Sequence, residues 1–119
     1  MEDRRKSNRR FMLYYMPIYD ADSLHQAGNL VDITPQGIMI VSEHPIKEAH
    51  VLHIRLELTG DVAAKNYMEF HARCKWCRQD ISPKLYSIGF EILDLAPGDA
   101  DIIQRIISTY GFRDNRPVK

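Results

Sequence analysis

A chain of 119 residues is long enough for one domain with a hydrophobic core and too short for two. Its sixteen basic and sixteen acidic residues cancel at pH 7, which argues against a protein drawn by its overall charge to nucleic acid or an anionic membrane. No stretch is long and apolar enough to cross a bilayer or to form the apolar part of a signal peptide. We therefore expect a soluble, cytoplasmic protein.

Residues 1–10 are predicted to form a flexible basic arm. They are polar and without periodicity, and they carry five cations, Arg4, Arg5, Lys6, Arg9 and Arg10. Like charges repel, and no apolar residue anchors the segment to a core. Positive charge concentrated at one end of a neutral chain suits a small anionic ligand better than a long polyanion.

Strand patterns dominate the chain after this arm. The clearest is Val51–Leu58, where apolar residues alternate with His53, Arg55 and Glu57, as in a strand with one buried face. A turn-rich stretch is expected between Asp20 and Gly28. Further strands are predicted at residues 11–17, 29–34, 37–41, 67–78 and 85–93.

The pattern changes to a helical one near the C-terminus. The apolar positions at helical spacing are Ile102, Ile103, Ile106, Ile107 and Tyr110. Asp99 or Asp101 favours the first turn, and Gly111 suits the stop. Such a one-sided helix must bury its isoleucine stripe, and one end of a barrel is the natural partner. The sequence thus predicts a small antiparallel β-barrel with a C-terminal helix over residues 11–112, followed by a tail at 113–119.

Two short motifs carry the functional prediction. The first is an Arg-x-x-x-Arg pair, Arg5 and Arg9, and the second is Asp-x-Thr-x-x-Gly, formed by Asp32, Thr34 and Gly37. Each is weak alone, because a basic run is often a solvated tail and the second motif is also an ordinary turn. Together, in this order and in a chain of this size and strand pattern, they favour a binding site.

The two motifs resemble those of the PilZ domain family, whose ligand is the bacterial second messenger cyclic di-GMP. The resemblance extends from Arg4 to about Tyr110 and includes Tyr86–Phe90, which is similar to the family's last strand. The chain departs from the family pattern at Thr34, where Ser is usual. The resemblance implies a PilZ-like split barrel with six antiparallel strands and a C-terminal helix.

The chemistry of these residues suits a cyclic dinucleotide. Arg5 and Arg9 would hold phosphate and guanine, because a guanidinium pairs with phosphate oxygens and stacks on aromatic rings. Asp32 would accept hydrogen bonds from a guanine edge, and Thr34 would add a hydroxyl contact. Gly37 would permit a positive φ or a close approach of the backbone to the ligand.

Two more arginines complete the predicted ligand site. Arg10 belongs to the same basic run, and Arg4 stands before the first motif. In this family an arginine at that place often accompanies two intercalated ligand molecules, which we expect here. Ligand phosphates would neutralise the arm and draw it across the barrel, so that binding orders it and changes a surface for an unidentified protein partner.

Two other functions stay open. The first is a PilZ-like adaptor that binds protein and no nucleotide, which the threonine at position 34 permits. The second is a barrel that binds single-stranded nucleic acid, although the cations lie on the arm and the strands have mixed charge. The sequence predicts no enzyme, because it contains no Gly-rich phosphate loop, serine elbow or acid pair suited to catalysis.

No metal or cofactor is expected either. The five histidines have no metal-type spacing, and Cys74, Cys77 and His71 give three ligands where structural zinc needs four. In a regular strand the two cysteines would face opposite ways, so we interpret them as reduced structural thiols. Trp76 is placed on the same face as Cys74, with packing in the core or on the sheet surface favoured over a place beside a ligand.

Overall fold

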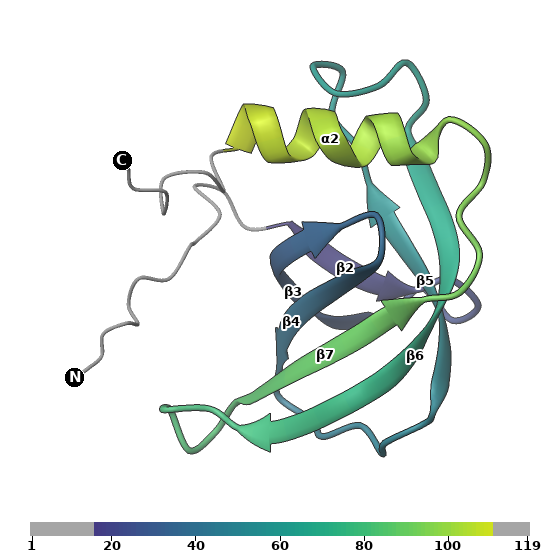
Figure 1. Ribbon diagram of the computed structural model, residues 1–119. Coiled ribbons are helices and arrows are strands. Elements are labelled where there is room, and N and C mark those ends of the chain that lie inside the picture. Colours follow the sequence, from purple (N-terminus) through teal and green to yellow (C-terminus); the bar gives the residue numbers. More distant parts are fainter. Residues whose placement is uncertain (1–15, 111–119) are drawn as a thin grey trace.

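The computed structural model describes residues 16–110, and there the chain forms a closed β-barrel with a helix across one end (Figure 1). Around the barrel the strands follow the order β2, β3, β4, β7, β6, β5, and β5 pairs with β2 to close it. All neighbouring strands are antiparallel. The predicted fold class, a six-stranded antiparallel barrel with a C-terminal helix, is confirmed.

Most predicted element bounds agree closely with the structure. The elements are β2 (Pro17–Asp20), β3 (Gln26–Thr34), β4 (Gly37–Ser42), β5 (Val51–Glu57), β6 (Tyr67–Gln79), β7 (Tyr86–Ile92) and α2 (Asp99–Tyr110). From β4 to β7 the observed strands match the predicted ones to within one residue at each end.

The beginning of the barrel differs from the sequence prediction. Of the strand expected at 11–17, residues 11–15 lie outside the described part of the chain, and the strand β2 that begins at Pro17 and extends to Asp20 was not predicted. β3 begins at Gln26, earlier than expected, because its ladder with β2 continues through Gly28. The turn is therefore shorter than the composition of this stretch indicated.

Alternating side chains fill the barrel. In β5, Ile54 and Leu56 are fully buried while Glu57 is exposed, which is the period of two predicted from the sequence. In β4, Ile38 and Ile40 alternate in the same way. Closure removes sheet edges, and these inward residues form a continuous core with those of β3, β6 and β7.

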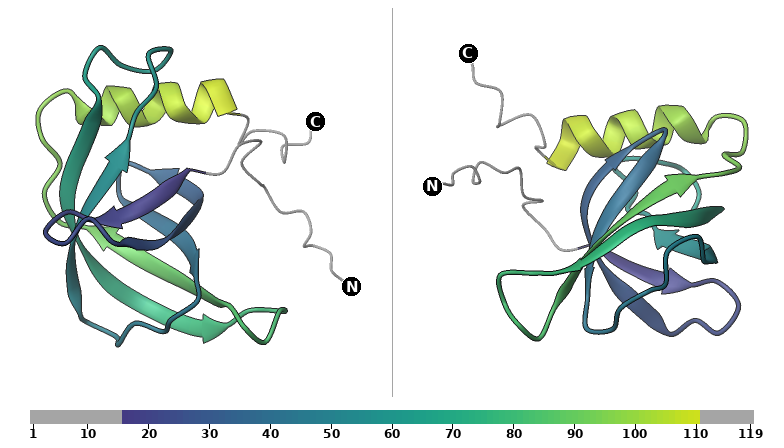
Figure 2. Two further views of the ribbon diagram at one scale, coloured as in Figure 1. Left: turned by 180° about the vertical axis from the view of Figure 1, so that it is seen from behind. Right: turned by 60° about the horizontal axis from the view of Figure 1, so that its bottom comes forward.

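Helix α2 closes one end of the barrel, as Figure 2 shows from two further directions. Ile102, Ile103 and Ile106 are buried in the core cluster, so the predicted isoleucine stripe is confirmed. The predicted stop at Gly111 lies outside the described residues. Between residues 16 and 110, no helix is long and apolar enough to cross a membrane.

The β5–β6 loop is fastened to this helix. Val62 is buried in the core, and its carbonyl accepts a hydrogen bond from Arg105. Lys65 pairs with the buried carboxylate of Asp99 at 2.7 Å, at the first residue of α2. Loop and helix therefore cover this end of the barrel together.

Candidate ligand-binding site

The candidate site lies on the outer surface of four neighbouring strands, β3, β4, β7 and β6. The strand register sets two rows of outward side chains across them. The first row consists of Asp32, Met39, Gly89 and Trp76. The second row, in the same strand order, consists of Thr34, Gly37, Glu91 and Arg73.

A bulge in β3 turns Asp32 toward this surface. In a regular strand Leu30 and Asp32 would share a face, because they are two residues apart. The register shifts between them, and the extra residue Val31 reverses the alternation. Leu30 is therefore buried in the core, while Asp32 is only partly buried and its carboxylate accepts a hydrogen bond from the Ile33 amide at 2.9 Å.

A second bulge, in β6, does the same for Trp76. Cys74 lies opposite Phe90 and Trp76 lies opposite Gly89, so two residues of β6 span one step of β7. Cys74 is buried inside the barrel, whereas Trp76 is half-buried on the outer surface. The prediction that Trp76 shares a face with Cys74 is therefore wrong, because it assumed an unbroken alternation.

The same bulge changes the arrangement of the two cysteines. Cys77 lies opposite the buried Ile88, so it faces inward as Cys74 does. The expectation that the cysteines face opposite ways is therefore wrong. Both are free thiols, and burial, followed by the nearby Cys77 and Glu48, raises the pKa of the Cys74 thiol.

The junction between β3 and β4 is held by the threonine of the second motif. The hydroxyl oxygen of Thr34 accepts hydrogen bonds from the amides of Gln36 and Gly37, both at 3.2 Å. At Gly37 an added Cβ would lie 2.4 Å from the carbonyl oxygen of Phe90. Gly37 does not have the positive φ that was one expectation; its missing side chain instead lets β4 approach β7 closely, and a close approach to the ligand stays a prediction.

These residues surround an open pocket of about 280 Å³. Asp32, Thr34 and Gly37, three residues predicted from the second motif, all line it. The remaining lining residues are Ile33, Ile38, Met39, Lys75, Trp76, Gly89 and Phe90. A carboxylate, a hydroxyl, an ammonium group and an indole thus converge on one depression of the barrel wall.

Lys75 and Trp76 carry the polar and aromatic groups of the pocket that the sequence analysis did not assign to the ligand. The bulge places both at the pocket, and the guanidinium of Arg78 lies over the indole, 4.5 Å from the ring centroid. The signal in the sequence was Gly89, since a glycine within a strand often lies against an aromatic side chain of the neighbouring strand. Matching Gly89 to Trp76 would have required the bulged register, which the alternating pattern did not reveal.

The cationic part of the predicted site lies elsewhere. Arg4, Arg5, Arg9 and Arg10 are outside the described residues, so the structure does not place them relative to the pocket. In the part of the chain that the structure describes, no three His, Cys, Asp or Glu side chains are grouped to hold a metal ion.

The described part of the chain is thus an antiparallel six-stranded barrel whose Asp-x-Thr-x-x-Gly turn lines an outward-facing pocket. The family model described as PilZ domain matches residues 3–109. The chain therefore belongs to the PilZ domain family. A search of curated proteins found no significant match.

The fold is similar to that of a solved structure described as the Bacillus subtilis inhibitor of motility, MotI/DgrA. The TM-score is 0.66 at 16% sequence identity, over 92% of this chain. The chain spans 56% of the length of that protein. At this identity the likeness concerns the barrel and its helix.

Proposed function

We propose that this chain is a receptor for cyclic di-GMP. PilZ domains are receptor or adaptor domains rather than enzymes, and the family assignment supports this class of function. The observation that carries the proposal is the convergence of Asp32, Thr34 and Gly37 with Lys75 and Trp76 on one pocket.

The pocket offers a partner for each part of a guanine nucleotide. The carboxylate of Asp32 accepts hydrogen bonds from the N–H groups of a guanine edge. The Trp76 indole rests against Gly89 and carries the Arg78 guanidinium over its ring, so a guanine base stacks on it when Arg78 moves aside, and such stacking contributes roughly 1–3 kcal/mol per base. The ammonium group of Lys75, on the same wall, suits a phosphate.

The N-terminal arginines complete the proposed site. Arg5 and Arg9 hold phosphate and guanine, with Arg10 beside them, and the ligand fixes the N-terminal segment against the outer surface of β3 and β6. Arg4 stacks on a second, intercalated ligand molecule. Thr34 keeps its hydroxyl in the turn, so its part is to shape the pocket.

We also propose that the protein passes on the binding signal by docking to a protein partner. Fixing the N-terminal segment over the barrel changes the surface that a partner meets. A receptor of this kind needs no catalytic group of its own, since the ligand alone selects between two surfaces.

Nuclear magnetic resonance on the labelled chain tests the proposal. Addition of cyclic di-GMP should shift the amides of the Thr34–Gly37 turn and the indole signal of Trp76. Asp32→Asn should weaken binding at least tenfold, whereas Asp101→Asn, an exposed change on α2, should leave it unchanged.

Two outcomes would overturn the proposal. Absence of any shift would favour the adaptor that binds protein and no nucleotide. Binding of an oligonucleotide in preference to the cyclic dinucleotide, with steep salt dependence, would favour the nucleic-acid-binding barrel.

A further inference from the structure

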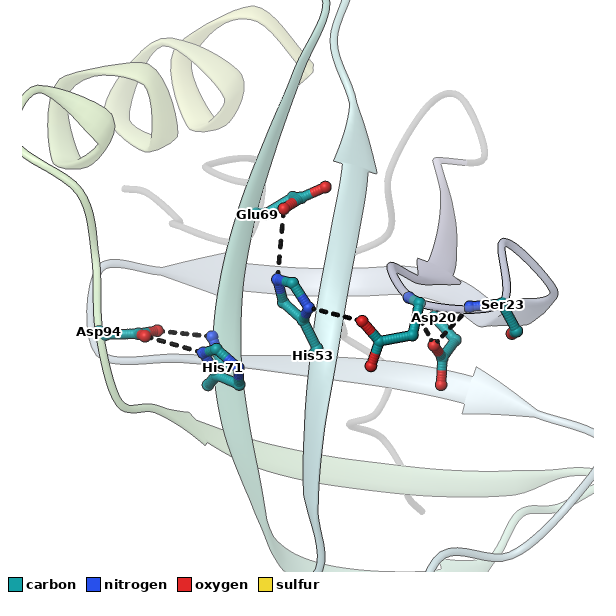
Figure 3. Close-up of polar contacts among 7 residues, drawn as sticks. Asp20, Ser23, His53, Glu69, His71 and Asp94 are labelled. Atoms are coloured by element: carbon teal, nitrogen blue, oxygen red, sulfur yellow. Dashed lines mark hydrogen bonds and ion pairs between the residues drawn. The ribbon is translucent and has the colours of Figure 1, made fainter.

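A second polar cluster lies on the outer surface of β5 and β6. His53 and His71 are direct partners in the ladder between these strands. Their imidazole rings are stacked, with centroids 4.4 Å apart and planes within 11° of parallel. Carboxylates approach from both sides, as Figure 3 shows.

His53 contacts a carboxylate at each ring nitrogen. Its Nδ1 lies 3.2 Å from Asp22 Oδ1, and its Nε2 lies 3.2 Å from Glu69 Oε1. Ionised carboxylates only accept hydrogen bonds, so both contacts are satisfied together only when both ring nitrogens donate. A neutral ring can donate to only one of the two carboxylates, whereas the imidazolium can donate to both.

His71 is bound to Asp94 at two points. Its backbone amide donates to Asp94 Oδ1 at 2.6 Å, and its Nδ1 lies 2.8 Å from Oδ2 (Figure 3). The backbone hydrogen bond from His71, aided by its side-chain bond and by the charges of His71 and His53, lowers the pKa of Asp94 against the effect of desolvation. The carboxylate is thus ionised throughout the range in which histidine titrates.

The cluster joins three parts of the barrel. Asp22 belongs to the β2–β3 turn, where Asp20 accepts hydrogen bonds from the amides of Asp22 and Ser23. Asp94 belongs to the segment between β7 and α2, whose Leu93 amide donates to the His71 carbonyl. Both connections are therefore held against the wall formed by β5 and β6.

We propose that this cluster is a protonation-sensitive clasp that ties the β2–β3 turn and the β7–α2 segment to the barrel wall. The histidine clasp consists of Asp22, His53, Glu69, His71 and Asp94. With both imidazoles protonated, two cations lie among three carboxylates, and the imidazolium–carboxylate contacts outnumber the one repulsive contact between the stacked rings. With both imidazoles neutral, one ring nitrogen of His53 directs its lone pair at a carboxylate. The three carboxylates of the clasp then lie close together without a cation between them.

The surrounding charges do not replace the imidazoles. Arg55, beside His53 on β5, is paired with Glu57 at 3.0 Å, and Arg73 on β6 is paired with Glu91 at 3.4 Å. Asp20, on the side of β2, is engaged within its own turn. Protonation of the two imidazoles is therefore the charge change that acts on the clasp.

A metal site is the competing explanation for paired histidines and carboxylates. The nitrogen lone pairs of stacked, nearly parallel rings lie in two separate, nearly parallel planes, so they do not converge on one ion. Among the described residues no metal-binding group of three such side chains is found. The geometry favours the clasp.

Thermal unfolding at pH 5.5 and pH 8.0 tests the proposal in the full chain. The wild type should be more stable at pH 5.5, because a histidine that gains carboxylate partners on folding stabilises below its titration and loses that effect as pH rises. His53→Gln keeps a similar size without a charge change, and should lose more than half of this difference in melting temperature. His50→Gln, at an exposed position, should keep it.

A second measurement does not depend on the variant folding well. In the wild type at pH 5.5 the ring-nitrogen shifts of His53 should show protons on both nitrogens, and raising the pH to 8.0 should lower hydrogen-exchange protection of the His71 amide. Equal pH dependence in His53→Gln and wild type, or a neutral His53 ring at pH 5.5, would overturn the proposal. A rise in melting temperature on adding Zn²⁺ that His53→Gln abolishes would replace the clasp with a metal site.

Discussion

The indole of Trp76 lies directly over Gly89 of the neighbouring strand. A Cβ at position 89 would be 2.4 Å from the indole nitrogen Nε1, so only glycine lets the ring rest against the sheet. The β6 bulge that pairs these two residues also turns the ring outward to the pocket. Trp76 is the single tryptophan of the chain, so its emission reports on the pocket alone.

Gly89→Ala should displace the indole and weaken binding of cyclic di-GMP. The ring must swing away from the added methyl group, which removes a stacking surface that contributes roughly 1–3 kcal/mol. Tryptophan emission of the free protein should shift, and a ligand titration should show the lower affinity. Gly60→Ala is the matched control, because an added Cβ there meets nothing within 4 Å. Unchanged emission and affinity in Gly89→Ala would disprove this role for the pair.

Thr34→Val should destabilise the β3–β4 turn by about 1–2 kcal/mol, because two backbone amides lose their acceptor. Thr34→Ser keeps the hydroxyl and should stay within about 0.5 kcal/mol of the wild type. Chemical denaturation of both variants measures the difference. Similar stability of the valine and serine variants would show that the hydroxyl contributes little to the turn.

The end of α2 is predicted to depend on Tyr110. Its hydroxyl lies 2.7 Å from the Thr59 hydroxyl and 3.2 Å from both carboxylate oxygens of Asp61, while the ring is buried. Tyr110→Phe keeps the ring, so the loss should be that of a hydrogen bond, about 0.5–1.5 kcal/mol. Denaturant unfolding at pH 7 measures it, and a loss no greater than that of the exposed change Gln104→Ala would contradict the expectation.

This contact also has a pH dependence of known sign. The side-chain hydrogen bond from Thr59, supported by the Asp61 backbone and Tyr110, lowers the pKa of Asp61 against desolvation. Its contribution to stability is present above the ordinary carboxyl pKa and is lost as pH falls through the lowered value. The free energy of unfolding of Asp61→Asn should therefore be lower than that of the wild type at neutral pH. Below pH 4 it should decrease less steeply than that of the wild type.

Cys74 should react slowly with a thiol reagent at neutral pH. Burial raises the pKa of this thiol, and the thiolate is the reactive form. In Cys77→Ser the remaining thiol should react mainly after denaturant is added, whereas in Cys74→Ser the half-buried Cys77 should react in the folded protein. Fast labelling of folded Cys77→Ser would contradict the inward placement of Cys74.

Regular periodicity predicted most of the barrel. The alternation in Val51–Glu57 and the isoleucine stripe of α2 each follow from residues that lie on one face of a repeating structure. The motif Asp32-x-Thr34-x-x-Gly37 located one wall of the pocket through its resemblance to a family.

The β6 wall of the pocket could not be predicted from the alternation of inward and outward residues. One inserted residue in β6 reverses the facing of every later side chain in that strand, so Trp76 is found outside and Cys77 inside. The composition of Cys74–Cys77 gives no local signal for the bulge, which is seen only in the pairing with β7. The sequence analysis did not predict the histidine clasp either, because its five residues come from four separate segments that only the fold brings together.

Calorimetric titration of the full chain with cyclic di-GMP, beside Arg9→Ala and the exposed control Lys47→Ala, tests the receptor function most directly. We predict saturable binding with two ligand molecules per chain in the wild type and control, and loss of binding in Arg9→Ala. A ratio of one would remove the role proposed for Arg4 and leave the receptor intact. No heat and no thermal shift with the wild type would contradict the receptor function itself.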